Sequence, residues 1–213
     1  MPRTEPEQPS GGPRSRKGAA TRVRLIEAAK GVFEETGFLE ARITDIADRA
    51  GLSHGSFYHY FESKEQIFRE VAEAQEAQLT APEDSDGEPP ASELDRIERA
   101  NRRYLERYRD NGRIMGVIEE VSRYDAHVNG ARMQRQKHFA DRAERAIRRL
   151  QKEGVADPGI DPEIAAVALG SMVARFAELW LVEDWGEFDF DTVAHQLTRL
   201  WANALGLQEP PKA

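Results

Sequence analysis

The chain has 213 residues, of which 39% are hydrophobic and 32% charged, and its formal net charge is −8. This size suits one ordinary domain, or a small and a larger one, with a substantial core, and the charged fraction excludes a protein that lies wholly within a membrane. There is no cysteine, which excludes disulfides and thiolate chemistry and favours a cytoplasmic location.

The N-terminal segment is rich in Pro, Gly and Ser and has no apolar run that would indicate a secretory signal. We expect residues 1–16 to form a disordered basic tail. Residues 1–24 hold six basic and two acidic residues, a net charge of +4, so the rest of the chain carries −12. A basic N-terminal arm on an acidic body predicts that a polyanion would bind at the N-terminal end. A tail that only increases solubility explains the same charges.

Helical periodicity runs through the N-terminal third. In residues 21–35 the apolar side chains fall at i, i+3, i+4, i+7 and i+8, which is one face of a helix, and Gly37 is placed to end it. Ser53 is a suitable N-cap for a short helix. Four helices are predicted here, over residues 21–35, 43–50, 54–61 and 63–78.

Residues 80–92 interrupt this pattern with three prolines, one glycine and four acids, and we expect a loop. Beyond it, Asp161 and Pro162 have the residue types of an N-cap and the first helical position. No segment alternates with the period of a strand, so the predicted fold class is all-α. The later helices are expected over residues 93–109, 113–123, 126–152, 162–182 and 191–205.

Residues 165–182 contain three polar side chains, Ser171, Arg175 and Glu178. The segment is close to the shortest length of a membrane span, but two charges near its middle would be costly in lipid. Arg175 and Glu178 are three residues apart and could pair on one helix face. We therefore favour a helix buried between its own domain and a partner over a membrane span.

The requirements of a helix-turn-helix are met within residues 43–61, which read ITDIADRAGLSHGSFYHYF. Ala47 is small enough for two helices to touch, and Gly51 tolerates the positive φ of a turn. The preceding helix, expected over residues 21–35, is the third helix of the motif. Apolar residues that can anchor both helices to it are Ile46, Ala50, Leu52, Phe57 and Phe61.

With Leu52 and Phe57 turned inward, the polar side chains of the second helix face outward. Such docking places the start of this helix in the major groove, where hydroxyls and imidazoles can meet phosphates and base edges. His54 and His59 are five residues apart and do not share a helix face, so no metal site is expected. Tyr60 is either core or functional. The sequence thus predicts double-stranded DNA as the partner of this patch.

The segment GLSHGSFYHYFESKEQIF, residues 51–68, resembles the signature of the TetR family (tetracycline-repressor-like) of transcriptional regulators, and the match extends over about residues 21–68. The resemblance implies an all-α homodimer with a helix-turn-helix DNA-binding domain, residues 17–63, and a helical ligand-binding and dimerisation domain, residues 64–213. It also implies a repressor that binds a palindromic operator and is released by a small hydrophobic ligand.

By this resemblance Tyr58 and Lys64 contact phosphates, while His54, Gly55 and His59 face the groove. Where the family often has Thr opening the second helix, this chain has Arg42, with Thr44 two residues on, and either could reach a phosphate. The predicted DNA-binding residues are Arg42, Thr44, Ser53, His54, Gly55, Ser56, Tyr58, His59 and Lys64.

The resemblance further implies a pocket among the later helices. Long apolar stripes, from Val167 to Trp180 and from Val193 to Leu205 with Leu197 and Trp201, predict a homodimer interface through the last two helices. Apolar stripes at helical spacing also arise from ordinary core packing, which is the alternative for each lining residue. The candidate ligand-binding residues are Tyr104, Tyr108, Met115, Ile118, Phe139, Met172, Phe176 and Trp180.

An enzyme is the competing class, but His127, His138 and His195 show no metal spacing, and neither a phosphate-binding glycine loop nor a nucleophile elbow is present. We expect no catalytic activity and no cofactor. A DNA-binding architectural protein or activator without a small-molecule ligand is the other alternative. An apolar cavity in the body would argue against it.

Overall fold

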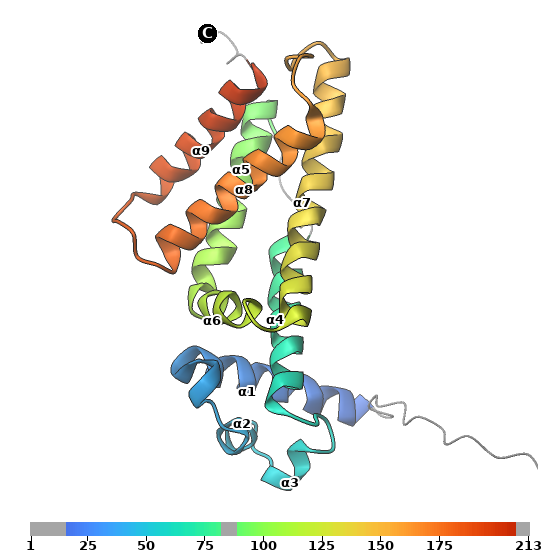
Figure 1. Ribbon diagram of the computed structural model, residues 1–213, viewed down its shortest axis with the longest axis vertical. Coiled ribbons are helices and arrows are strands. Elements are labelled where there is room, and N and C mark those ends of the chain that lie inside the picture. Colours follow the sequence, from blue (N-terminus) through green and yellow to red (C-terminus); the bar gives the residue numbers. More distant parts are fainter. Residues whose placement is uncertain (1–15, 82–88, 208–213) are drawn as a thin grey trace, which may run out of the picture. The chain divides into compact units, whose positions relative to one another are not determined.

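The computed structural model describes residues 16–81 and 89–207. Every regular element within these ranges is an α-helix, and the helices are numbered α1 to α9 in chain order (Figure 1). The all-α prediction is therefore confirmed. The helices group into two compact units, Met1–Val71 and Ala72–Ala213. Residues 1–15, which form nearly all of the expected tail, and most of the expected loop lie outside the described residues.

The first unit contains α1 (Arg16–Glu40), α2 (Ile43–Arg49), α3 (His54–Phe57) and the beginning of α4 (Lys64–Thr80). An aromatic cluster holds α1 and α4 together, because the ring of Phe68 lies 4.9 Å from the rings of both Phe33 and Phe38, edge to face. This packing explains why the unit extends to Val71, beyond the residue 63 boundary proposed from the sequence.

Two helices of this unit differ from the expected lengths. The helix α1 begins at Arg16 and continues to Glu40 through a kink at Gly37, whose φ of 74° suits glycine. The helix α3 ends at Phe57, because the next amides bond three residues back: His59 N–H donates to the Ser56 carbonyl at 3.3 Å and Tyr60 N–H to that of Phe57 at 2.9 Å.

The second unit contains α5 (Glu93–Asp110), α6 (Gly112–Ser122), α7 (Ala126–Lys152), α8 (Pro162–Leu181) and α9 (Phe190–Leu205), with α7 beside α8 and α5 beside α9. Side-chain caps open four of these helices, because Ser92, Asp125, Asp161 and Asp189 each accept a backbone N–H from the first turn. The caps fix where α5, α7, α8 and α9 begin. One end of the unit is closed by a buried cluster that includes Ile147, Leu150, Ala166, Ala202 and Leu205.

The helix α8 is only partly enclosed by its own unit. Ala166 and Ala177 are buried, but Ile164 is 70% and Val167 52% exposed. Among the described residues α8 is the one helix with the length and composition of a membrane span, a feature that core helices share. Arg175 and Glu178 do pair, with 2.5 Å between Nη1 and Oε1. The structure thus leaves one apolar face of α8 uncovered within its own unit.

Candidate functional site

The turn between α2 and α3 has the geometry that the sequence predicts. Gly51 has a φ of 65°, and the N–H of Leu52 donates to the carbonyl of Ala47 at 2.9 Å, which closes the turn. Ser53 caps α3 by accepting the N–H of Ser56 at 3.2 Å. Ile46, Ala47 and Phe57 are fully buried, so α2 and α3 are both anchored through their apolar sides.

The polar side chains of this motif are available on its surface. The ring of Tyr58, which is 50% exposed, lies edge-on to that of His54 with 5.3 Å between centroids. The hydroxyls of Ser53 and Ser56 are 2.7 Å apart. Of the nine predicted DNA-binding residues, seven are exposed: Arg42, Thr44, Ser53, His54, Gly55, Tyr58 and His59.

Lys64 occupies a different position from the one that the resemblance implies. Its ammonium donates to the carbonyl oxygens of Phe38, Leu39 and Ala41 at 2.7, 3.0 and 3.0 Å. An ammonium has three N–H bonds, so these carbonyls use all of them. In this arrangement Lys64 ties the end of α1 to the start of α4 and has no N–H for a phosphate.

Arg22, one of the basic residues near the N-terminus, is also engaged within the first unit. Its guanidinium pairs with Glu70 and lies 5.0 Å from the ring centre of Phe61. Within residues 16–24, the exposed basic side chains are therefore those of Arg16, Lys17 and Arg24.

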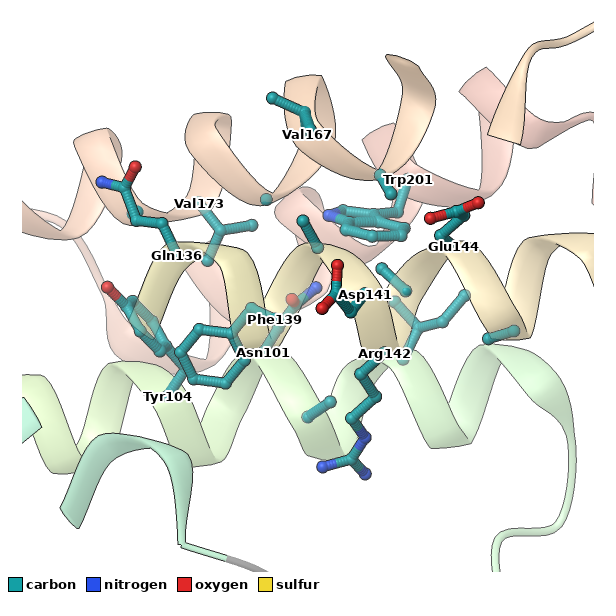
Figure 2. Close-up of a pocket in the computed structure, with 18 of the residues that line it drawn as sticks. Asn101, Tyr104, Gln136, Phe139, Asp141, Arg142, Glu144, Val167, Val173 and Trp201 are labelled. Atoms are coloured by element: carbon teal, nitrogen blue, oxygen red, sulfur yellow. The ribbon is translucent and has the colours of Figure 1, made fainter. Parts of the chain in front are cut away.

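The second unit contains a cavity of about 510 Å³ between α5, α7, α8 and α9 (Figure 2). This volume falls within the usual range of small-molecule sites. Tyr104 and Phe139 lie toward one end and Trp201 toward the other (Figure 2). Apolar side chains on its wall include Ile97, Phe139, Ile147, Leu150, Val173 and Leu205.

Two of the eight candidate ligand-binding residues, Tyr104 and Phe139, line this cavity, and their rings meet edge to face at 5.5 Å. The other six lie elsewhere. Tyr108, Met115 and Ile118 are buried in the packing of α5 and α6, which is the core alternative. Met172 lies on α8 off the cavity wall, and Phe176 and Trp180 pack against Phe188 instead.

Residues that line the cavity carry buried polar atoms without a hydrogen-bond partner among the described residues. They are the Tyr104 hydroxyl, Nε and Nη1 of Arg135, and Nε1 of Trp201. Arg135 is 5% exposed, and its Nη1 lies 3.0 Å from Oε2 of Glu76, although the two atoms are not aligned as a hydrogen bond. Burial raises the pKa of Glu76, and the charge of Arg135 opposes that rise.

Arg135 and Trp201 line the cavity but are not among the candidate ligand-binding residues, and Trp201 belongs to the apolar stripe predicted for the dimer interface. A signal for Arg135 existed, since it lies seven residues after Val128 on the buried face of α7, where the helical period calls for an apolar side chain. Leu197, which lies in the same predicted stripe, is 4% exposed and packs within its own unit.

Comparisons with known proteins agree with the geometry of the first unit. Residues 25–71 match the family model of bacterial regulatory proteins, tetR family. An uncharacterized HTH-type transcriptional regulator, YdgC, from Bacillus subtilis is 46% identical over 55 residues, which are 26% of this chain and 28% of YdgC. The chain thus spans little more than a quarter of this relative, and the likeness concerns the DNA-binding domain.

Two longer likenesses include the second unit. The A-factor receptor protein of Streptomyces griseus is 27% identical over 187 residues, covering 85% of this chain and 61% of the receptor. The structure of NalD, the secondary repressor of the MexAB-OprM multidrug efflux pump in Pseudomonas aeruginosa, is 26% identical, with a TM-score of 0.64 over 90% of this chain and 98% of NalD. From the helix-turn-helix geometry, the family model and these relatives, we conclude that residues 25–71 form a DNA-binding domain of the type found in bacterial regulatory proteins of the tetR family.

Proposed function

We propose that this protein is a ligand-responsive transcriptional repressor that binds a palindromic operator as a homodimer and is released by a small hydrophobic molecule. The observation that carries the proposal is the coexistence in one chain of an exposed helix-turn-helix surface and a largely apolar cavity. A cavity of this size argues for a ligand and against an architectural DNA-binding protein with a solid core. A repressor that acts on DNA works in the cytoplasm.

The DNA-facing residues of the proposal are Arg42, Thr44, His54, Tyr58 and His59, with Gly55 allowing close approach of the backbone. All of these side chains are exposed. Imidazole and hydroxyl groups can read base edges and phosphates without a large positive field, which suits a chain with a net charge of −8.

The homodimer is proposed to form through α8 and α9. Exposed residues of α8 include Ile164, Val167, Ala168 and Ser171, which share one helix face and carry no charge. Leu200 on α9 is 51% exposed. An uncharged face of this kind on two adjacent helices suits an isologous interface of four helices. A dimer with two-fold symmetry then contacts two half-sites of an operator.

The names of the relatives support a repressor with a ligand. NalD is titled a repressor of an efflux pump and the S. griseus protein an A-factor receptor. Selection of bound fragments from a genomic DNA library by the purified protein tests the proposal. Enrichment of a site with two inverted half-sites is expected, and equal retention of genomic and random fragments would contradict it.

A further inference from the structure

The cavity has a chemical preference that goes beyond an apolar ligand. Arg135 Nε and Trp201 Nε1 can only donate hydrogen bonds, and the Tyr104 hydroxyl is free to donate. A buried donor without a hydrogen bond is destabilising. A ligand with acceptor oxygens therefore gains binding free energy by accepting hydrogen bonds from these donors. The unpartnered buried acceptors of the second unit, on Gln75 and Glu76, lie outside the cavity wall.

The residues that line the cavity include more cations than carboxylates: Arg96, Arg103, Arg107, Arg135, Lys137 and Arg142 against Glu93, Asp141, Glu144 and Glu163. Three of the wall's carboxylates are already paired: Glu93 with Arg149 at 2.9 Å, Asp141 with Lys137 at 2.9 Å and Glu144 with Arg148 at 2.6 Å. The guanidiniums of Arg103, Arg107 and Arg142 cluster on the wall, and burial together with the other two charges lowers the pKa of Arg103. A positive potential in a partly desolvated cavity favours an anion.

We propose that the cavity binds an amphipathic carboxylate, with the head group on the Arg135 guanidinium and the Tyr104 hydroxyl and the apolar chain along α5, α7 and α8. This proposal rests on the ligand-responsive function above and names the class of ligand. Arg135 supplies a buried charge on the wall, and Tyr104 supplies a donor that no protein atom uses.

The same geometry connects the ligand to α4 through Arg135. Arg135 is one of the residues that line the cavity, and its Nη1 lies 3.0 Å from Oε2 of Glu76, which belongs to the second-unit part of α4. The carboxylate of the ligand and that of Glu76 therefore compete for one guanidinium. Because α4 is continuous from Lys64 to Thr80, a weakened Arg135–Glu76 contact acts on the helix that begins in the DNA-binding unit.

The test uses the full chain without DNA and three ligands with one apolar chain: decanoate, decanol and decylamine, each below its micelle concentration or solubility limit. Calorimetric titration at neutral pH is expected to show decanoate binding about tenfold more tightly than decanol, at the low end of what a hydrogen bond to a charged group contributes. Decylamine is expected to bind most weakly. Equal affinities for acid and alcohol, or no binding of decanoate, would overturn the proposal.

Matched variants locate the head group. Tyr104→Phe is expected to weaken decanoate about tenfold without loss of folding, because the hydroxyl has no partner in the protein. Tyr108→Phe is the control, since Tyr108 is a buried neighbour that does not line the cavity. If the two variants weaken decanoate equally, the head group is not at Tyr104 and the proposal falls.

Replacing Arg135 alone leaves Glu76 buried and unpaired, so the double variant Arg135→Met with Glu76→Met is the appropriate one. It is expected to bind decanoate and decanol equally well, whereas Arg145→Met, on the exposed side of α7, keeps the preference. A double variant that still prefers decanoate would refute the role of Arg135.

Release of operator DNA is measured separately, so that the two proposals fail separately. If decanol releases the operator and decanoate does not bind, the repressor function stands and the carboxylate proposal is wrong. If decanoate binds with the expected preference and no DNA site is found, the carboxylate proposal stands and the repressor function is wrong.

Discussion

The ammonium of Lys64 lies on Phe38, with Nζ 2.7 Å from the Phe38 carbonyl oxygen and 4.8 Å from the centre of its ring. We therefore predict that Lys64→Met destabilises the first unit by about 1 to 2 kcal/mol, because it removes hydrogen bonds from a charged donor. Thermal unfolding measures this loss. Lys17→Met, an exposed cation on α1, is the control and is expected to leave the melting temperature unchanged.

The salt dependence of operator binding separates this role from a phosphate contact. A lost phosphate contact reduces the slope of log affinity against log salt by about 0.9. Lys64→Met is expected to leave the slope unchanged at temperatures where the variant is folded. A reduced slope with an unchanged melting temperature would restore the phosphate contact that the resemblance implies.

Deletion of residues 1–17 is expected to flatten the salt dependence of operator binding and to preserve site preference, because these residues carry four basic side chains: Arg3, Arg14, Arg16 and Lys17. Operator titrations at several salt concentrations measure the slope. Arg22→Gln is the contrasting variant, since Arg22 pairs with Glu70 and its loss should lower the melting temperature instead. An unchanged slope after the deletion would mean that the arm is a solubilising tail.

Leu200→Glu is predicted to yield monomers with poor operator affinity, because a carboxylate would be buried in the proposed α8–α9 interface. Sedimentation velocity at several concentrations detects the change. Val155→Glu is a matched control, since Val155 is 47% exposed, close to the 51% of Leu200, and lies outside both helices. A dimeric Leu200→Glu variant would place the interface elsewhere.

Asp189 is predicted to make the stability of α9 depend on pH. The backbone N–H and the hydroxyl of Thr192 each donate to its carboxylate at 2.8 Å, and these bonds lower the pKa of Asp189. The stabilisation is complete above the ordinary pKa of 3.8 and is lost as the pH falls through the lowered value. Asp189→Ala should melt earlier than the parent at neutral pH, and the difference should shrink in acid. Asp189→Asn, which keeps the cap, should show a smaller loss at neutral pH.

The sequence was most informative where one local rule decides the structure. Gly51, Ser53, Asp161 and Pro162 fixed a turn and two helix starts, because each of them satisfies a specific φ or an unpaired N–H. The end of α3 was less predictable, since Phe57 and Phe61 are both buried whether the residues between them form a full helix or a tighter turn.

The cavity was hardly predictable, because it depends on how helices far apart in sequence diverge. Aromatic side chains of α8 were reasonable candidates, but Phe176 and Trp180 pack with Phe188 instead. Arg135 is a charged residue that becomes buried through tertiary packing. Helical periodicity predicts on which face of α7 it lies, but not that it lines a cavity. The partners of Lys64 likewise come from α1 and the residue that follows it, a contact that no local pattern contains.

The position of Trp201 on the cavity wall gives the protein a built-in optical reporter. The chain has three tryptophans, and the other two, Trp180 and Trp185, are not on this wall. Replacing those two with phenylalanine leaves a single indole whose N–H lacks a partner, so its emission responds to the polarity and hydrogen bonding of whatever enters the cavity. Occupancy of the site can then be followed in real time without a label.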